Sequence, residues 1–323
     1  MSSESRISVP VSESWDTYWQ GAHNSAAYSG GGVSHPAFHA FWDNFLQNVQ
    51  IPQGTLRCID IASGNGSIVE HLNSIFGNGA CEITCLDISQ SAISSIEKRF
   101  PAVTGIVADA ADIPFDSAAF DIVTSQFGVE YAGAGAIGES ARLVSSGGQL
   151  AFLLHHAGGS IYRECAASLD AIRRTQESNF IPLAIRLFET GFAASRGADR
   201  KAYDDAGRAL SPAVRALEDI MQTHGEHVGG NAIASLYADV GKIHSSIQQY
   251  EPTEVIGWLE QMASEMDAYS GRMSSMCDSA MDEQAFQSVA KTLSGNGLTV
   301  KTERSLDDPG TGQPLAWAIV ASN

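Results

Sequence analysis

Apolar and polar positions follow two different periods along residues 56–156. Short apolar, β-branched runs at 56–61, 82–88, 104–109, 120–128 and 147–156 predict five strands. The stretches between them at 66–76, 89–100 and 135–144 carry helical spacing, and Ser89 is a candidate N-cap. Short strands that alternate with helices favour a parallel sheet with helices on both faces.

The end of the chain changes this pattern. Two strand-like stretches, 297–306 and 313–322, are joined by turn residues that include Pro-Gly. We therefore predict an α/β fold: a doubly wound, mostly parallel seven-stranded sheet with a C-terminal antiparallel hairpin. Residues 157–290 carry helical spacing and predict a helical insertion, or cap, between strands five and six.

Three sections follow from this reading. Residues 51–156 and 291–323 form the predicted core, and residues 157–290 form the predicted cap for substrate binding. Residues 1–50 are rich in aromatic side chains and are expected to cover the active site.

Composition narrows the possible partners. The net charge of −18 argues against a nucleic-acid partner, because a protein that neutralises phosphates needs a basic surface. No apolar run approaches the length of a membrane span, and the first ten residues lack the features of a signal peptide. Five scattered cysteines fit a reducing compartment. We expect a cytoplasmic protein, monomeric or homodimeric, with no nucleic-acid or membrane partner.

Candidate chemistry begins at the first strand, where Cys-Ile-Asp-Ile-Ala-Ser-Gly-Asn-Gly occupies residues 58–66. The dinucleotide fingerprint needs a third glycine, and Val69 stands in its place. Asp60 precedes the turn, where a carboxylate would repel a pyrophosphate. A ligand with a cationic or zwitterionic group suits this turn better.

Three more segments follow in order: Asp87 at the end of the second strand, Asp109 within Val-Ala-Asp-Ala-Ala-Asp-Ile-Pro-Phe, and Glu-Ser-Ala-Arg-Leu-Val-Ser-Ser-Gly-Gly at 139–148. With the Gly turn, they resemble the sequence motifs of class I S-adenosylmethionine-dependent methyltransferases over about residues 55–155. Ala62 replaces the first glycine of the family's turn, and Ser146 stands where proline is common.

The resemblance implies S-adenosylmethionine as the cofactor and a role for each motif. Gly64 and Gly66 would let the backbone approach the methionine and ribose, with Asp60 near the ammonium group. Asp87 would bind the ribose hydroxyls, and Asp109 with Ala110 would contact adenine. The predicted cofactor-binding residues are Asp60, Ala62, Ser63, Gly64, Gly66, Asp87, Ile88, Asp109, Ala110, Gln126, Phe127 and Gly128.

Each of these residues also has a structural interpretation. Asp87 and Asp109 are also of a type that caps the helices that follow them, but the order of the motifs favours the ligand role for both. Glu139 and Arg142 favour a structural pair on one helix.

The acceptor site is expected at the ends of strands four and five. A base is needed there only if the acceptor must lose a proton. The candidate catalytic residues are Glu130, Tyr131, His155 and His156. The candidate substrate-binding residues are Trp15, Tyr18, Trp19 and Tyr28, whose rings would favour a cation, although Trp19 also fits a helix face packed on the sheet. No metal site is predicted, because His-Gly-Glu-His at 224–227 lacks the spacing of a zinc motif.

These observations predict an enzyme that transfers a methyl group from S-adenosylmethionine to a small soluble molecule by in-line displacement, with a nitrogen or oxygen acceptor favoured. Two alternatives stay open. One is a nicotinamide-dependent oxidoreductase, and the other is a non-catalytic cofactor-binding or assembly protein with the same fold.

Overall fold

The computed structural model describes residues 16, 19, 35–49, 54–77 and 79–323. The chain divides into two compact units, Met1–Arg163 with Ser275–Asn323, and Glu164–Ser274. The second unit is shorter than the insertion of 157–290 expected from sequence, because the last helix before the hairpin falls in the first unit. None of the helices in the described residues is both long and apolar enough to cross a membrane.

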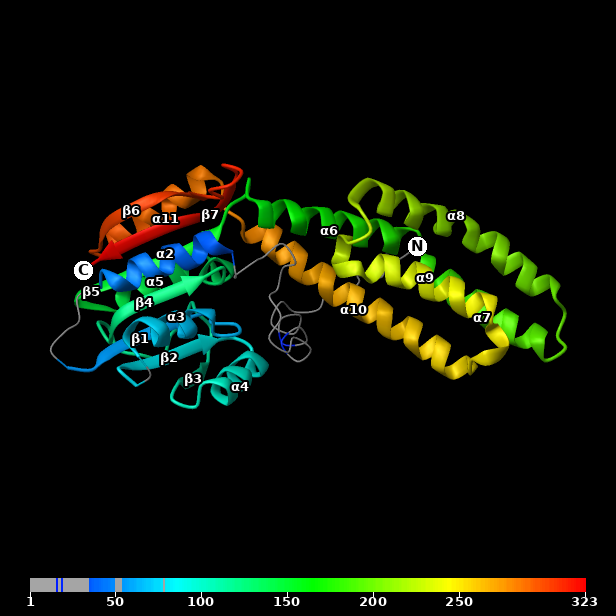
Figure 1. The fold of residues 1–323 in the computed structure, drawn as a ribbon, viewed down its shortest axis with the longest axis horizontal. Coiled ribbons are helices and arrows are strands. Elements are labelled where there is room, and N and C mark those ends of the chain that lie inside the picture. The colour runs from blue at the N-terminus through cyan, green and yellow to red at the C-terminus, as the bar shows by residue number, and fades with distance from the viewer. Residues whose placement is uncertain (1–15, 17–18, 20–34, 50–53, 78) are drawn as a thin grey trace, which may run out of the picture. The chain divides into compact units, whose positions relative to one another are not determined.

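The first unit contains a seven-stranded sheet (Figure 1). Its order is β3-β2-β1-β4-β5-β7-β6; the first five strands run parallel, and β7 runs antiparallel to both β5 and β6. This confirms the predicted fold class. The strands are β1 (Leu56–Ile61), β2 (Cys81–Asp87), β3 (Thr104–Val107), β4 (Phe120–Gln126), β5 (Val144–His155), β6 (Thr299–Asp307) and β7 (Pro314–Ser322).

Helices connect the parallel strands, and their ends follow local sequence signals. The Ser89 hydroxyl accepts a hydrogen bond from the Ala92 amide at 3.2 Å, which confirms the predicted N-cap. The helices of this unit are α2 (Pro36–Gln47), α3 (Ser67–Phe76), α4 (Gln90–Arg99), α5 (Gly133–Arg142) and α11 (Glu283–Gly295), with a short 3₁₀ helix η2 (Val129–Ala132) before α5.

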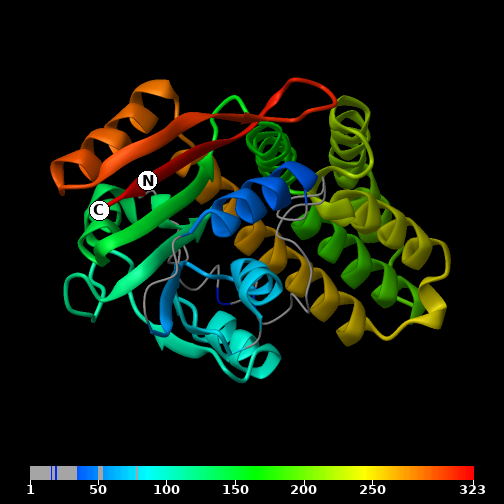
Figure 2. The same ribbon diagram turned by 60° about the vertical axis from the view of Figure 1, so that its left-hand side comes forward.

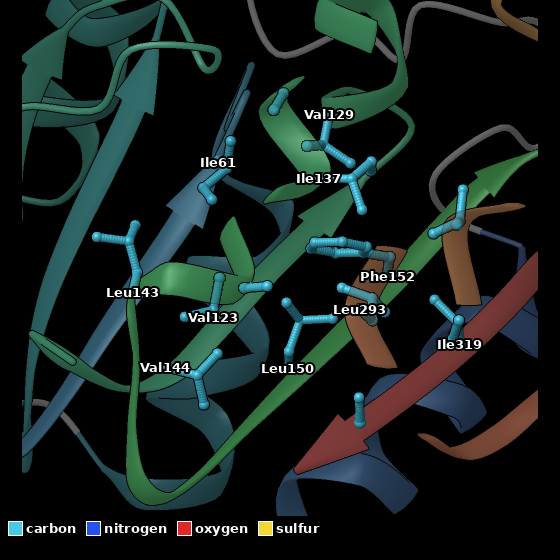
Figure 3. Packing of buried hydrophobic residues seen from close by; sticks show 14 of the residues in the cluster. Ile61, Val123, Val129, Ile137, Leu143, Val144, Leu150, Phe152, Leu293 and Ile319 are labelled. Atoms are coloured by element: carbon cyan, nitrogen blue, oxygen red, sulfur yellow. The ribbon is translucent and has the colours of Figure 1, made fainter. Parts of the chain in front are cut away.

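Both faces of the sheet are covered. Figure 3 shows Val123, Phe152 and Ile319 of the sheet in one apolar cluster with Ile137 of α5 and Leu293 of α11. On the opposite face, side chains of alternate strand residues meet α2 and α3, which also pack on each other. The sheet is therefore doubly wound, as its alternating pattern predicts.

The second unit is helical (Figure 2). Its apolar core includes Phe188 of α7, Leu217 of α8, Leu236 of α9 and Leu259 of α10. Helices α6 and α10 begin or end in the first unit, so the chain enters and leaves the second unit within helices. The elements between β5 and α11 are α6 (Ser160–Glu177), α7 (Phe180–Ser195), α8 (Lys201–His224), η3 (Val228–Asn231), α9 (Ala232–Ser245), η4 (Ile247–Gln249) and α10 (Pro252–Ser279).

Candidate cofactor and acceptor site

A cavity of about 420 Å³ lies at the carboxyl ends of β1, β2 and β4 in the first unit. Ligands of open α/β sheets bind in this place, where the strand order reverses beside β1. Among the described residues that line it, two are aspartates and none is lysine or arginine. The lining consists of Trp19, Ala62, Gly64, Leu86, Asp87, Ile88, Ala108, Asp109, Ala110, Phe127, Gly128, Tyr131, Ala132 and Ser275.

Asp87 joins two segments of the cavity wall. Its Oδ2 accepts a hydrogen bond from the Gly64 amide, and its Oδ1 accepts one from the Ser89 amide, both at 2.9 Å. Burial raises the pKa of Asp87, and these backbone donors act in the opposite direction. A carboxylate oxygen accepts more than one hydrogen bond, so both oxygens retain capacity for ligand hydroxyls. Asp87 therefore fixes the Gly turn and lines the cavity at the same time.

The Gly turn uses left-handed backbone at three positions: φ is +53° at Ala62, +51° at Gly64 and +77° at Gly66. Ala62 replaces the family's first glycine and still adopts the conformation that glycine prefers, at a cost of about 1 kcal/mol. The turn is also crowded. A Cβ at Gly128 would lie 2.5 Å from the Ala62 Cβ, and a Cβ at Gly64 would lie 2.8 Å from the Trp19 ring.

Asp60 lies beneath the turn, is 1% exposed and does not line the cavity. Thr124 Oγ1 lies 3.0 Å from Asp60 Oδ1. Burial raises the pKa of Asp60 to about 8; the Thr124 hydrogen bond lowers it, and the nearby Asp87 charge raises it further. A cation at this end of the cavity would favour the ionised carboxylate.

The far wall of the cavity comes from the residues after β2 and β3. Ile88 is 50% exposed although it is large and apolar, and it lines the cavity beside Asp109 and Ala110. Asp109 Oδ1 accepts a hydrogen bond from the Ala111 amide at 2.8 Å, which turns the chain after β3.

Arg142 holds the loop that continues from this turn. Its guanidinium donates to the carbonyl oxygens of Ile113 and Phe115 at 3.2 and 2.8 Å. It also pairs with Glu139 at 2.7 Å, and this pairing lowers the pKa of Glu139. The predicted structural pair is therefore confirmed.

Three predicted cofactor-binding residues, Ser63, Gly66 and Gln126, lie outside the cavity lining. Ser63 donates its amide to the Leu86 carbonyl at 3.1 Å, and Gly66 begins α3. Gln126 accepts a hydrogen bond from the Trp42 indole of α2, because alternation along β4 places it on the α2 face. Like Asp60, none of the three lines the cavity, and their proposed role is limited to supporting its wall.

Two residues of the N-terminal section contact the same wall. Asp16 Oδ1 accepts hydrogen bonds from the Ser91 amide and the Ser89 hydroxyl, at 3.0 and 2.7 Å. Trp19 lines the cavity against Gly64, next to cofactor-binding candidates, and its expected contact with an acceptor stays a prediction. The other aromatic candidates, Trp15, Tyr18 and Tyr28, lie outside the described residues.

The four catalytic candidates separate into two groups. His155 Nδ1 lies 2.7 Å from Glu130 Oε1, and both side chains are buried. Tyr131 lines the cavity. His156 instead stacks on Trp317 with ring centroids 4.2 Å apart, and burial lowers the pKa of His156. Consecutive strand residues point to opposite faces, so the sheet separates the two histidines.

Four lining residues were absent from the sequence prediction. Leu86, Ala108 and Ala132 are apolar neighbours of motif residues, and adjacency to the predicted carboxylates and to Tyr131 was their available signal. Ser275 lies near the end of α10, more than a hundred residues from any motif. A serine on a helix carries no sequence signal for such a role.

A doubly wound sheet with an acidic, glycine-walled cavity at its carboxyl edge defines the Rossmann-like, class I methyltransferase type of fold. The family model described as a methyltransferase domain matches residues 59–152. Residues 59–152 thus match a methyltransferase domain, and S-adenosylmethionine is the cofactor of the class I methyltransferases that this part of the chain resembles.

Two curated proteins are similar to this chain over part of its length. A mitochondrial 2-methoxy-6-polyprenyl-1,4-benzoquinol methylase of Caenorhabditis elegans is 26% identical over 156 residues, which cover 45% of this chain and 51% of the relative. A malonyl-[acyl-carrier protein] O-methyltransferase of Enterobacter lignolyticus is 32% identical over 98 residues, which cover 30% and 38%. The chain spans about half the length, or less, of these relatives.

Solved structures with a similar arrangement include one described as the conversion of a disulfide bond into a thioacetal group during echinomycin biosynthesis. It has a TM-score of 0.38 and 23% identity, and the match covers 50% of this chain and 66% of that one. Geranyl diphosphate C-methyltransferase from Streptomyces coelicolor A3(2), with S-adenosyl-L-homocysteine bound, has a TM-score of 0.34 and 16% identity, over 45% and 65% of the two chains.

Proposed function

We propose that this protein transfers a methyl group from S-adenosylmethionine to a small soluble molecule by in-line displacement, with nitrogen or oxygen as the favoured acceptor. The observation that carries the proposal is the cavity wall in which the Gly64 amide is bound to the buried Asp87 carboxylate. A wall that presents carboxylates and no described basic side chain suits a positively charged ligand and repels a diphosphate.

The residues present fit the cofactor. Gly64 and Gly128 line the cavity, and a Cβ at either position would collide with Trp19 or Ala62 in the same wall. In our proposal Asp87 binds the ribose hydroxyls and Ile88 packs on the adenine ring. Asp60, through water, balances the ammonium group. When bound, the cofactor supplies an electrophilic methyl group, and the chain aligns the acceptor with it and excludes water.

The size of the cavity supports ligands that are small molecules. Its volume of about 420 Å³ lies in the range of small-molecule sites. The acidic composition is consistent with an acceptor other than a nucleic acid. That residues 1–50 and the helical unit help to enclose the acceptor stays a prediction from the sequence. Hydrogen exchange of the helices in Glu164–Ser274 with and without an acceptor would test it.

Calorimetry on ligand-stripped protein tests the proposed function. We expect S-adenosylhomocysteine to bind with one site per chain and NADH to give no heat. Saturation by NADH, with no binding of S-adenosylhomocysteine, would support the oxidoreductase alternative instead. Binding without product from any acceptor would support the non-catalytic alternative.

A further inference from the structure

Glu130 and His155 form a buried pair at the carboxyl ends of β4 and β5. Glu130 belongs to η2, which follows β4, and His155 is the last residue of β5. Glu130 Oε1 accepts two hydrogen bonds, from the His155 backbone amide at 2.9 Å and from Nδ1 at 2.7 Å. The side chains are 0% and 1% exposed. One carboxylate oxygen is therefore fixed by two donors from a single residue.

The second carboxylate oxygen has no such donor. Glu130 Oε2 is buried and has no hydrogen-bond partner in the described part of the chain. An unsatisfied buried acceptor costs about 1–3 kcal/mol, and more when the group is charged. If the pair only joined β4 to β5, burying Oε2 without a donor would cost stability and bring no benefit. A ligand that donates a hydrogen bond would remove the cost.

The pair lies directly behind the cavity wall. The His155 ring contacts Phe127 and Tyr131, with centroids 4.7 and 5.6 Å apart, and both of these residues line the cavity. Phe127 holds a left-handed backbone with φ of +55°, a strained conformation of the kind found at functional sites. The His155 ring therefore connects Glu130 to two residues of the cavity wall.

The same walls indicate the class of acceptor. Aromatic side chains favour an aromatic partner stacked or edge-on against them. A phenol is aromatic, donates one hydrogen bond, and must lose its proton to become a good nucleophile at neutral pH. Its ring suits the aromatic walls of Phe127 and Tyr131, and its hydroxyl suits the carboxylate oxygen of Glu130 that the described residues leave unpaired, which can accept both a hydrogen bond and the proton.

Resting on the proposed function, we infer that Glu130 is the general base for a small phenolic acceptor and that His155 is its positioning residue. The phenol O–H bond breaks, and its proton passes to Glu130 Oε2. The oxygen lone pair attacks the methyl carbon in line. The carbon–sulfur bond breaks, and its electron pair stays on the sulfur of S-adenosylhomocysteine. The proton on Glu130 returns to solvent after the product leaves.

Four proteins test this inference: wild type, Glu130→Gln, His155→Asn, and the matched control Glu303→Gln, which changes an exposed glutamate on β6. Calorimetry with S-adenosylhomocysteine comes first, and we expect all four to bind equally. If the wild type fails to bind, the proposed function fails, and the inference about Glu130 falls with it. If the wild type binds, the remaining measurements concern Glu130 alone.

Initial rates with a panel of mono- and dihydric phenols follow, from pH 6 to 9. We expect Glu130→Gln to lower kcat/KM by about 10²–10⁴-fold at pH 7, the usual size of a general-base contribution. The remaining rate should rise with pH, because phenolate formed in solution then becomes the substrate. His155→Asn should displace the pH profile, and Glu303→Gln should match the wild type. An unchanged rate in Glu130→Gln overturns the inference.

A measurement without turnover covers the case in which Glu130→Gln does not fold. 4-Nitrophenol, added to the wild type with S-adenosylhomocysteine, absorbs differently as phenol and phenolate. We expect the phenolate band to grow on binding, at a pH where free 4-nitrophenol is mostly protonated. If the band does not grow and the phenol panel yields no product, the inference is overturned.

Discussion

The sheet edge at the cavity has two halves, the ends of β1 and β2 and the ends of β4 and β5, and the buried carboxylate of each half has a different set of hydrogen-bond donors. At the ends of β1 and β2, both oxygens of Asp87 receive backbone amides, from Gly64 and Ser89. At the ends of β4 and β5, one oxygen of Glu130 receives two donors and the other receives none from the described residues. The carboxylate of the first half therefore has donors on both oxygens, whereas the carboxylate of the second half has one oxygen that the described part of the chain leaves unsatisfied. In our proposal this difference separates binding of a cofactor from chemistry on an acceptor.

The largest expected effect on cofactor binding tests the β1–β2 half. Asp87→Asn keeps the side-chain shape but replaces one acceptor oxygen with an amide that opposes a backbone donor. We expect binding of S-adenosylhomocysteine to weaken by about 10- to 100-fold, because the lost oxygen removes one hydrogen bond to a charged group, which contributes about 1.5–3 kcal/mol. Calorimetry measures the loss, with the exposed Asp112→Asn as control. Equal affinities would show that Asp87 only holds the Gly turn.

The junction between the two halves is the next target. Gly128→Ala places a Cβ 2.5 Å from the Ala62 Cβ, so we expect the free energy of unfolding to fall by about 1–3 kcal/mol. Adding Ala62→Gly removes one of the two colliding atoms and should restore part of the loss. Urea denaturation of the single and double variants measures the coupling. Strictly additive effects would contradict a direct contact between the halves.

The pH dependence of stability tests the buried acid beneath the turn. The folded pKa of Asp60 is raised to about 8, above its unfolded value of about 4. Between these values the folded state holds a proton that the unfolded state has lost, so Asp60's contribution to stability falls as pH rises from about 4 to 8. We expect Asp60→Asn to flatten that slope, measured as urea midpoints at several pH values. An unchanged slope would show that Asp60 is ionised in the folded protein.

The smallest expected effect comes from the turn itself. Ala62→Gly relieves a left-handed alanine with φ of +53°, although glycine also adds freedom to the unfolded chain. We expect a net stabilisation of up to about 1 kcal/mol in urea denaturation and no loss of affinity for S-adenosylhomocysteine. A clear destabilisation would mean that the alanine methyl group contributes packing that outweighs its strained backbone.

Sequence predicted one half of the cavity better than the other for a physical reason. Asp87 ends β2 and Asp109 follows β3, and strand ends meet at one edge of a parallel sheet, so local pattern was enough to place both in the cavity wall. The choice between His155 and His156 depends on which face each residue takes at the end of β5. Gln126 shows the same limit, because its partner Trp42 comes from a helix 84 residues away.

The end of α10 that lies in the first unit carries still less positional information. Its periodicity predicts a helix, but Ser275 reaches the cavity only through the path of the chain. Contacts of this kind depend on tertiary structure, and no local pattern encodes them.

Arg142 of the Glu-x-x-Arg motif also makes contacts outside α5, the helix that carries the motif. Its guanidinium donates hydrogen bonds to two carbonyl oxygens of the loop that follows Asp109, so α5 holds the segment that continues from the cavity wall. A residue that does not itself line the cavity thereby supports a residue that does. Loss of this guanidinium would therefore loosen the loop behind Asp109 while leaving the strands of the sheet paired.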